Sequence, residues 1–242
     1  MKKLLCILLL IPLAAFASEQ LPLDDAPVNL ADKVSLQRGA RTFVNYCLTC
    51  HSASYMRYNR LQDLGLTEQQ IKDNLLLATD KVGDTMSVAM RRADAKQWLY
   101  GAFPPDLSVV ARARGADWLY TFLRNFYRDP LRPNGWNNAL FHNVAMPNVL
   151  YQLQGQQGLK VETHTDEHGN KHENKKMVMD KPGTLTRDEF DTVIGDLVNF
   201  MVYMGEPAQI ARIPMGVVVL LFLAVFLVVV YATKREYWKD IH

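Results

Sequence analysis

Hydrophobic residues recur at helical spacing along most of the chain. In residues 35–46 one stripe is formed by Leu36, Ala40, Phe43 and Val44. A longer stripe in residues 186–204 is formed by Phe190, Val193, Ile194, Leu197, Val198, Met201 and Met204. Thr186 and Glu189 are spaced as a capping box at the start of the longer stripe. The 3.6-residue period of both stripes predicts two amphipathic helices.

Three shorter segments also have helical patterns, within residues 67–78, 94–99 and 116–127. No run of strictly alternating polar and apolar residues predicts a sizeable sheet. The pattern therefore predicts a mainly α domain.

The polar stretch 154–182 breaks this pattern. The sequences "LKVET" and "KKMVMD" on either side of "EHGN" predict a small exposed hairpin. His164, His168 and His172 recur every four residues, as a metal-binding helix face would require. A Gly-Asn pair at 169–170 opposes a helix there, so we interpret this stretch as a solvated loop.

Two apolar segments lie near the chain ends. At the N-terminus, Lys2 and Lys3 precede an apolar run over residues 4–13 and the small-residue motif Ala15-Phe16-Ala17, which is typical of a cleaved signal peptide. Cys6 lies within this segment and is expected to leave with it. Residues 213–232 contain no charge, and their length matches a bilayer core of about 30 Å.

The flanks of the second segment predict its orientation. Lys234, Arg235 and Lys239 place the C-terminus in the cytoplasm by the positive-inside rule. Pro214 suits the first turn of the membrane helix. The expected organisation is a signal peptide (1–17), a periplasmic domain (18–205), a short linker (206–212), a transmembrane helix (213–232) and a cytoplasmic tail (233–242). We therefore expect a single-pass protein of a bacterial inner membrane.

Composition supports a folded domain and excludes some functions. The chain is 49% hydrophobic and 21% charged, so disorder is not expected. Its formal net charge is only +2, and without a basic tract this does not favour nucleic-acid binding.

After removal of Cys6 the chain has two cysteines, in "CLTCH" at residues 47–51. C-x-x-C-H is the attachment signature of c-type haem, in which Cys47 and Cys50 form thioethers and His51 binds iron. A disulfide is the simplest alternative in an exported protein. A zinc site would need a second cysteine pair, and a thioredoxin-like redox pair would need a preceding βαβ pattern. We therefore expect one covalently attached haem c.

Iron bound by His51 needs a partner on its other face. A methionine there would raise the reduction potential and produce an electron carrier. The candidates are Met56, Met86, Met90, Met146, Met177 and Met179. Met146 is the best of them because Pro147 stiffens the backbone of its apolar loop, and His142 is the rival. Arg112 and Arg114 lie between an apolar run and Trp118, which favours an arginine partner for a haem propionate.

Together these motifs resemble the cytochrome c1 family, the haem subunits of the cytochrome bc1 complex. The resemblance is collinear over nearly all of the mature chain. It is carried by "RGARTFVNYCLTCHSASYMRYNRL", "PPDLSVVARARG", the Met146-Pro147 loop, "DLVNFMVYMGEPAQIAR" and the tail helix. It implies Met146 as distal ligand, Arg114 at a propionate and Trp118 at the haem edge, where the family usually has a tyrosine.

The resemblance also implies a fold and a function. It implies a class I cytochrome c-like domain in which residues 39–43 cross residues 200–203. Electrons would come from the Rieske iron–sulfur protein and leave to a soluble or membrane-bound cytochrome c. Cytochrome b would be the membrane neighbour in a dimeric ubiquinol–cytochrome c reductase, which oxidises quinol and translocates protons. The alternatives are a haem c subunit of another respiratory complex and an open-face haem sensor or peroxidase.

Overall fold

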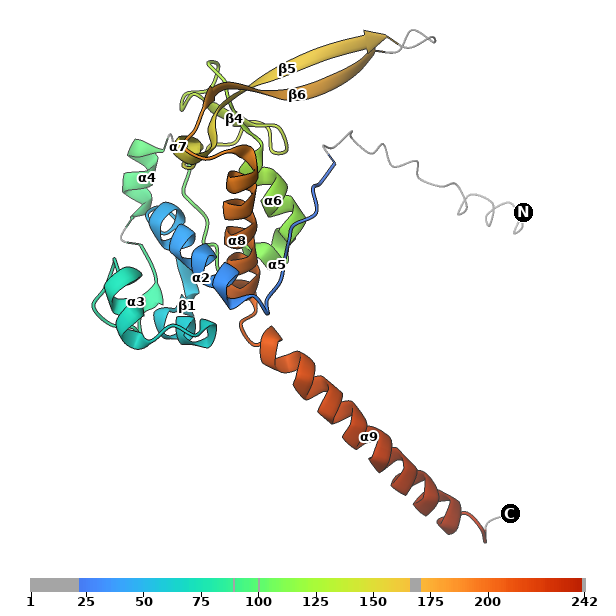
Figure 1. Cartoon of the computed structure of the whole chain (residues 1–242). Coiled ribbons are helices and arrows are strands. Elements are labelled where there is room, and N and C mark those ends of the chain that lie inside the picture. Colours follow the sequence, from blue (N-terminus) through green and yellow to red (C-terminus); the bar gives the residue numbers. More distant parts are fainter. Residues whose placement is uncertain (1–21, 89, 100, 166–170, 241–242) are drawn as a thin grey trace, which may run out of the picture.

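The chain folds into a helical head followed by one long helix (Figure 1). The computed structural model describes residues 22–88, 90–99, 101–165 and 171–240, without the side chains of residues 163–175. The predicted signal peptide lies outside these residues. The helices are α2 (Lys33–Thr42), α3 (Glu68–Asn74), α4 (Arg92–Trp98), α5 (Val110–Arg114), α6 (Ala116–Arg124), α7 (Tyr151–Gln154), α8 (Arg187–Gly205) and α9 (Gln209–Tyr237), with the π-helical turn η2 (Phe43–Cys47) and the 3-10 helix η3 (Tyr58–Leu64).

Strands are few and pair locally. In the described part of the chain, three antiparallel pairs form: β1 (Ala53–Arg57) with β2 (Thr85–Met86), β3 (Phe126–Arg128) with β4 (Trp136–Asn138), and β5 (Gly155–Thr165) with β6 (Lys171–Pro182). The mainly α prediction is confirmed.

The crossing of α2 and α8 organises the head. Gly39 packs so closely on α8 that a side chain there would overlap the carbonyl oxygen of Asp196. Beside this contact the rings of Phe43 and Phe200 lie 5.7 Å apart. The guanidinium of Arg38 binds the carboxylate of Asp196, with Nε 2.5 Å from Oδ2 and the second nitrogen 3.0 Å from Oδ1. The expected crossing of residues 39–43 over 200–203 is confirmed.

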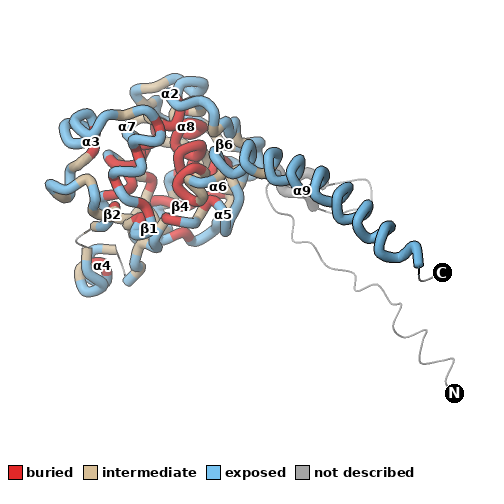
Figure 2. The backbone as a smooth tube through the Cα atoms, turned by 90° about the horizontal axis from the view of Figure 1, so that it is seen from below, coloured by how far each residue is buried: buried red, intermediate tan, exposed pale blue. Residues whose placement is uncertain are grey.

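The buried core of the head lies around the crossing of α2 and α8. Figure 2 shows the buried backbone concentrated in the head, whereas α9 is exposed along its length. Leu36, Ile194 and Leu197 are fully buried, as the stripes in the sequence predicted. Phe200 lies outside the predicted stripe and is fully buried as well. The capping box of Thr186 and Glu189 is also present at the start of α8.

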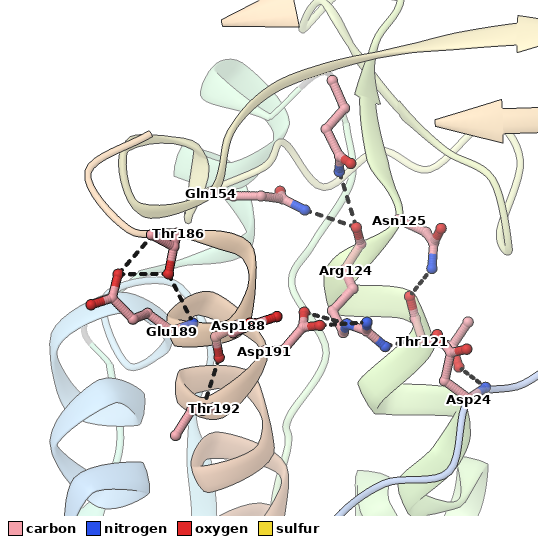
Figure 3. A network of polar contacts seen from close by, with 11 residues as sticks. Asp24, Thr121, Arg124, Asn125, Gln154, Thr186, Asp188, Glu189, Asp191 and Thr192 are labelled. Carbon is pink, nitrogen blue, oxygen red and sulfur yellow. Dashed lines mark hydrogen bonds and ion pairs between the residues drawn. The ribbon is translucent and has the colours of Figure 1, made fainter. Parts of the chain in front are cut away.

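Arg124 joins α6 to three other parts of the head (Figure 3). Its guanidinium contacts both carboxylate oxygens of Asp191 in α8, at 2.6 and 2.7 Å, and Asp24 at 2.8 Å. Its backbone carbonyl accepts hydrogen bonds from the side chains of Gln154 and Gln157 at the base of the hairpin. This arginine therefore ties the N-terminal segment, α6, α8 and the hairpin base together.

The hairpin is larger than the sequence predicted. β5 and β6 span 11 and 12 residues and project from the head at the end away from α9 (Figure 1). Positions 164 and 172 face each other in the ladder, so they are not part of a loop. Their interpretation as loop residues was wrong because cross-strand pairing extends beyond the segments with a strand-like pattern. Position 168 lies outside the described residues.

The connection to α9 is shorter than predicted. α9 begins at Gln209, so only residues 206–208 of the expected 206–212 linker are not helical. Pro214 lies inside α9 and not in its first turn. The ion pair of Arg212 with Glu206, at 3.0 Å, bridges this connection. α9 is long and apolar enough to cross a membrane.

Candidate haem-attachment site

A change of helix type leads into the cysteine motif. α2 continues into the π-helical turn η2, where the N–H of Leu48 donates to the carbonyl of Phe43. The N–H groups of Cys50 and His51 both donate to the carbonyl of Cys47, at 3.1 and 2.8 Å. The motif is therefore one tight turn that follows an amphipathic helix with one buried face. Single π-helical turns often occur at functional sites.

The two thiols are not joined to each other. Cys47 is buried and Cys50 is half-buried, and both are free. Burial, with a smaller contribution from Cys50, raises the pKa of the Cys47 thiol to about 12. Burial also raises the pKa of Cys50. Redox-active pairs have a lowered thiol pKa, so this environment does not favour a thioredoxin-like role.

The ring of His51 is oriented by a backbone carbonyl. Its Nδ1 lies 2.8 Å from the carbonyl oxygen of Pro105. A carbonyl only accepts hydrogen bonds, so Nδ1 carries the proton and Nε2 keeps its lone pair. Burial lowers the pKa of His51 and outweighs the opposite effects of Pro105 and Asp106. A neutral imidazole with Nε2 available is the form that binds a metal.

The PPDLS segment, residues 104–108, holds the chain that follows His51. Asp106 accepts hydrogen bonds from the N–H of Ser54 at 2.9 Å and from the N–H of Ser108 at 2.8 Å. The hydroxyl of Ser108 accepts one from the N–H of Tyr55 at 3.0 Å. In return, the N–H of Leu107 donates to the carbonyl of Ser52. These contacts fix the motif against the segment that supplies Pro105.

The residues of this turn fit a covalently held haem c. Two free thiols lie on one turn, followed directly by a neutral imidazole whose second nitrogen is fixed by hydrogen bonding. Thioether formation requires free thiols, and iron ligation requires the lone pair of Nε2. The thiols of Cys47 and Cys50 and the imidazole of His51 therefore match what a haem c needs. In the described residues no three His, Cys, Asp or Glu side chains form a metal-binding group.

Arg114 and Trp118 lie together on one side of consecutive helices. The guanidinium of Arg114 lies 5.0 Å from the ring centroid of Trp118. Trp118 stacks on Phe122 at 4.9 Å and meets the edge of Phe141 at 6.3 Å. Phe141 belongs to the loop of Met146. The aromatic contact therefore joins α6 to that loop.

The candidate distal ligands differ in burial. Met56 and Met86 are fully buried in the core, which is the ordinary position of a methionine. Met146 is half-buried and packs at the edge of the core, whereas His142 is exposed. This difference agrees with Met146 as the better candidate, and its role remains a prediction.

Sequence reasoning missed two sets of residues at the site. The first is the pairing of Asp106 and Ser108 with the chain after His51, for which the "PPDLS" motif was the available signal. The second is a group of three asparagines whose side chains bind the backbone of the loop of Met146, namely Asn134, Asn137 and Asn138. Their density in "PNGWNNALFHN" was the available signal.

Comparison with known proteins identifies full-length relatives. The profile of the cytochrome C1 family matches residues 24–241. A protein of Nitrosomonas europaea named "Ammonia monooxygenase gamma subunit" is 51% identical over 242 residues, which cover 100% of this chain and 98% of that protein. Cytochrome c1 of Allochromatium vinosum is 46% identical over 239 residues, covering 97% and 96%. Cytochrome c1 of Rhodospirillum rubrum is 27% identical over 238 residues, covering 87% and 83%.

Proposed function

The chain belongs to the cytochrome c1 family, and we propose that it passes single electrons from a Rieske iron–sulfur protein to a cytochrome c within a ubiquinol–cytochrome c reductase. Family membership supports a c-type cytochrome of a bc1 complex. The observation that supports the proposal most directly is the hydrogen bond that orients His51 beside two free thiols.

Six residues have proposed roles at the haem. Cys47 and Cys50 hold one haem c through thioethers, and His51 is its proximal ligand. Met146 is the distal ligand. Arg114 contacts a propionate and Trp118 the haem edge, with the guanidinium and indole already in contact with each other. The haem supplies an iron that alternates between the ferrous and ferric states.

The chain's own contribution is position and environment. Its oriented histidine and half-buried methionine would set the ligand field of the iron. It makes and breaks no bonds of a substrate. Quinol oxidation and proton translocation belong to the complex.

The proposed orientation follows from α9 and its flanks. The helix crosses the inner membrane, with Lys234, Arg235 and Lys239 on the cytoplasmic side and the head in the periplasm. Three residues separate the head from α9, so the head stays close to the membrane surface. Cytochrome b is the proposed membrane neighbour, in a dimeric complex.

One relative's name favours a second candidate. The Nitrosomonas europaea protein is named as a subunit of ammonia monooxygenase, and it is similar to this chain over its whole length. The second candidate is therefore a haem subunit of a monooxygenase complex.

Affinity purification of the tagged chain from native membranes distinguishes the candidates. Co-purification of cytochrome b and a Rieske protein, with antimycin-sensitive reduction of cytochrome c by quinol, supports the proposal. Recovery of monooxygenase subunits in their place supports the second candidate. Recovery of oxidase subunits would contradict both.

A further inference from the structure

The loop of residues 139–149 is held by side chains from the segment just before it. This loop contains no helix or strand that could satisfy its backbone groups. Its polar backbone is instead bound by a group that we name the polar clamp, which consists of Arg132, Asn134, Asn137 and Asn138. Besides the N–H of Ala139, which donates to the carbonyl of Asn125, the loop takes its shape from such side-chain contacts.

The clamp holds the first half of the loop through two buried amides. Oδ1 of Asn138 accepts the N–H of Leu140 at 2.9 Å and that of Phe141 at 3.1 Å. Nδ2 of the same side chain donates to the carbonyl of Phe122 at 2.8 Å, which ties the loop to α6. Oδ1 of Asn137 accepts the N–H of Asn143 at 2.9 Å.

The clamp then fixes a strained residue next to the second half of the loop. Asn143 has a φ of +60°, a conformation that non-glycine residues adopt rarely. Arg132 binds its side-chain oxygen at 3.1 Å and its carbonyl at 3.0 Å. This double contact stabilises a turn that the backbone alone would not favour.

Of the clamp's hydrogen bonds, the one nearest to Met146 along the chain comes from Asn134. Its Nδ2 donates to the carbonyl of Ala145 at 2.8 Å, and this carbonyl belongs to the peptide bond that begins Met146. Its Oδ1 accepts the N–H of Trp136 at 2.9 Å, so the amide is itself held in place. Asn134 therefore determines where the main chain presents Met146.

We propose that Asn134 is a positioning residue for the distal ligand. The inference rests on the proposed role of Met146. By fixing the Ala145 carbonyl, Asn134 reduces the conformations in which the thioether lies away from iron. Without this hydrogen bond the loop samples detached conformations more often. An external ligand then competes with Met146 more effectively.

The test uses imidazole as the competing ligand. Asn134→Asp keeps the size of the side chain and the acceptor for Trp136, but it places a carboxylate oxygen against the Ala145 carbonyl. We expect the affinity of the oxidised, full-length haem protein for imidazole to rise roughly three- to tenfold, which corresponds to the loss of one hydrogen bond. The sulfur-to-iron charge-transfer band should weaken in parallel.

Asn74→Asp is the matched control. Asn74 also donates from Nδ2 to a backbone carbonyl, that of Gln70 at 2.9 Å, but at the end of α3. The Asn74→Asp variant should leave the imidazole affinity of the haem protein unchanged, even if it lowers the stability of the protein to urea. Asn134→Ala removes the donor without adding a charge and should change the affinity in the same direction as Asn134→Asp. It keeps the test decisive if the aspartate variant does not fold.

Met146→Leu distinguishes a failure of the role of Asn134 from a failure of the distal-ligand assignment. If Met146→Leu abolishes the band and Asn134→Ala binds imidazole as tightly as the unmodified protein, the role of Asn134 is overturned and the proposed function stands. If Met146→Leu leaves the band intact, the distal-ligand assignment fails, and the role of Asn134 fails with it.

Discussion

The carbonyl oxygen of Pro105 lies 2.8 Å from Nδ1 of His51, although the two residues are 54 positions apart in the chain. This contact fixes the tautomer of the imidazole. The segment that contains Pro105 is in turn held by hydrogen bonds to the residues that follow His51. The carboxylate of Asp106 accepts a hydrogen bond from the N–H of Ser54, and the hydroxyl of Ser108 accepts one from the N–H of Tyr55. The site is therefore held by mutual contacts between two loops rather than by one rigid element.

Asp106 should make this arrangement sensitive to acid. Burial opposes its ionisation, but hydrogen bonds from Ser108 and Ser54 outweigh burial and lower its pKa. A lowered pKa in the folded state stabilises the protein above the unfolded value of about 3.9, and this contribution is lost as the pH falls through the lower folded pKa. Asp106→Asn should cost about 1 kcal/mol or less at neutral pH, because the exposed carboxylate is screened by solvent.

Urea unfolding of the two proteins at neutral pH and at about pH 3 measures this effect. The difference in unfolding free energy should shrink in acid. Asp25→Asn, at an exposed carboxylate in the N-terminal segment, is the control. A difference that stays constant or grows as the pH falls would contradict the role of Asp106.

Gly39 should tolerate no side chain. A methyl group there would overlap the backbone of Asp196, and backbone cannot move aside as a flexible side chain can. Gly39→Ala should therefore cost about 3 kcal/mol or more, at the upper end of the cost of overpacking. Gly83→Ala, with nothing within 4 Å of the added carbon, should change stability by less than about 0.5 kcal/mol. Equal stability of the two variants in urea would refute the close crossing of α2 and α8.

Covalent attachment predicts how the cofactor behaves on denaturation. If both cysteines form thioethers, haem should stay with the chain in acid–acetone and on denaturing gels. Cys50→Ser should leave a single thioether, and the double variant Cys47→Ser with Cys50→Ser should lose all haem under those conditions. The pyridine haemochrome spectrum measures the number of thioethers. Complete loss of haem from the unmodified protein would remove the basis of the proposed function.

The head should fold without α9. No residue of α9 is buried, and the core ends with α8. Truncation after Arg212 keeps the ion pair with Glu206 and should release a soluble, red periplasmic head with a near-native spectrum. Quinol oxidation in the cell should fall, because the chain would no longer assemble in the membrane. A truncated head that binds no haem would show that α9 is needed by the core.

The long amphipathic helices of this fold could be predicted from the sequence. The apolar stripes of α2 and α8 are continuous, so periodicity predicts both helices and part of what they bury. It does not predict the burial of Asp196, Asn199 and Tyr203 on the other sides of α8, which comes from the elements packed around this helix. The hairpin was underestimated because much of its length consists of polar residues that pair through the backbone, and backbone pairing leaves no hydrophobic pattern. α9 begins before residue 213. The expected bound came from the uncharged run, which Arg212 interrupts, whereas the helix itself includes residues 209–212.

The candidate site could be predicted only where the chemistry is local. Cys47, Cys50 and His51 are adjacent, so spacing alone identifies them. The contact of His51 with Pro105 and the contact of Asn134 with Ala145 depend on how loops meet in space, and one sequence does not specify this. Trp118 was expected at the haem edge, but its contacts with Arg114 and Phe141 required the structure.

The sharpest prediction compares Met146 with His142, which lie four residues apart in one loop. Met146 is half-buried and His142 is exposed. A thioether favours ferrous iron more than imidazole or water does, so its loss should lower the reduction potential. Met146→Leu should abolish the sulfur-to-iron band of the oxidised protein, lower the potential below that of the Rieske donor and allow the reduced iron to bind carbon monoxide.

His142→Leu is the matched variant and should change none of these properties. Spectroscopy, potentiometry and carbon monoxide binding on the two purified proteins decide between the residues. If Met146→Leu kept its spectrum and potential while His142→Leu lost both, the iron would have two histidine ligands and a lower potential. If the unmodified reduced protein bound carbon monoxide rapidly, the distal face would already be open, as in a sensor or peroxidase, and a closed electron carrier would be excluded.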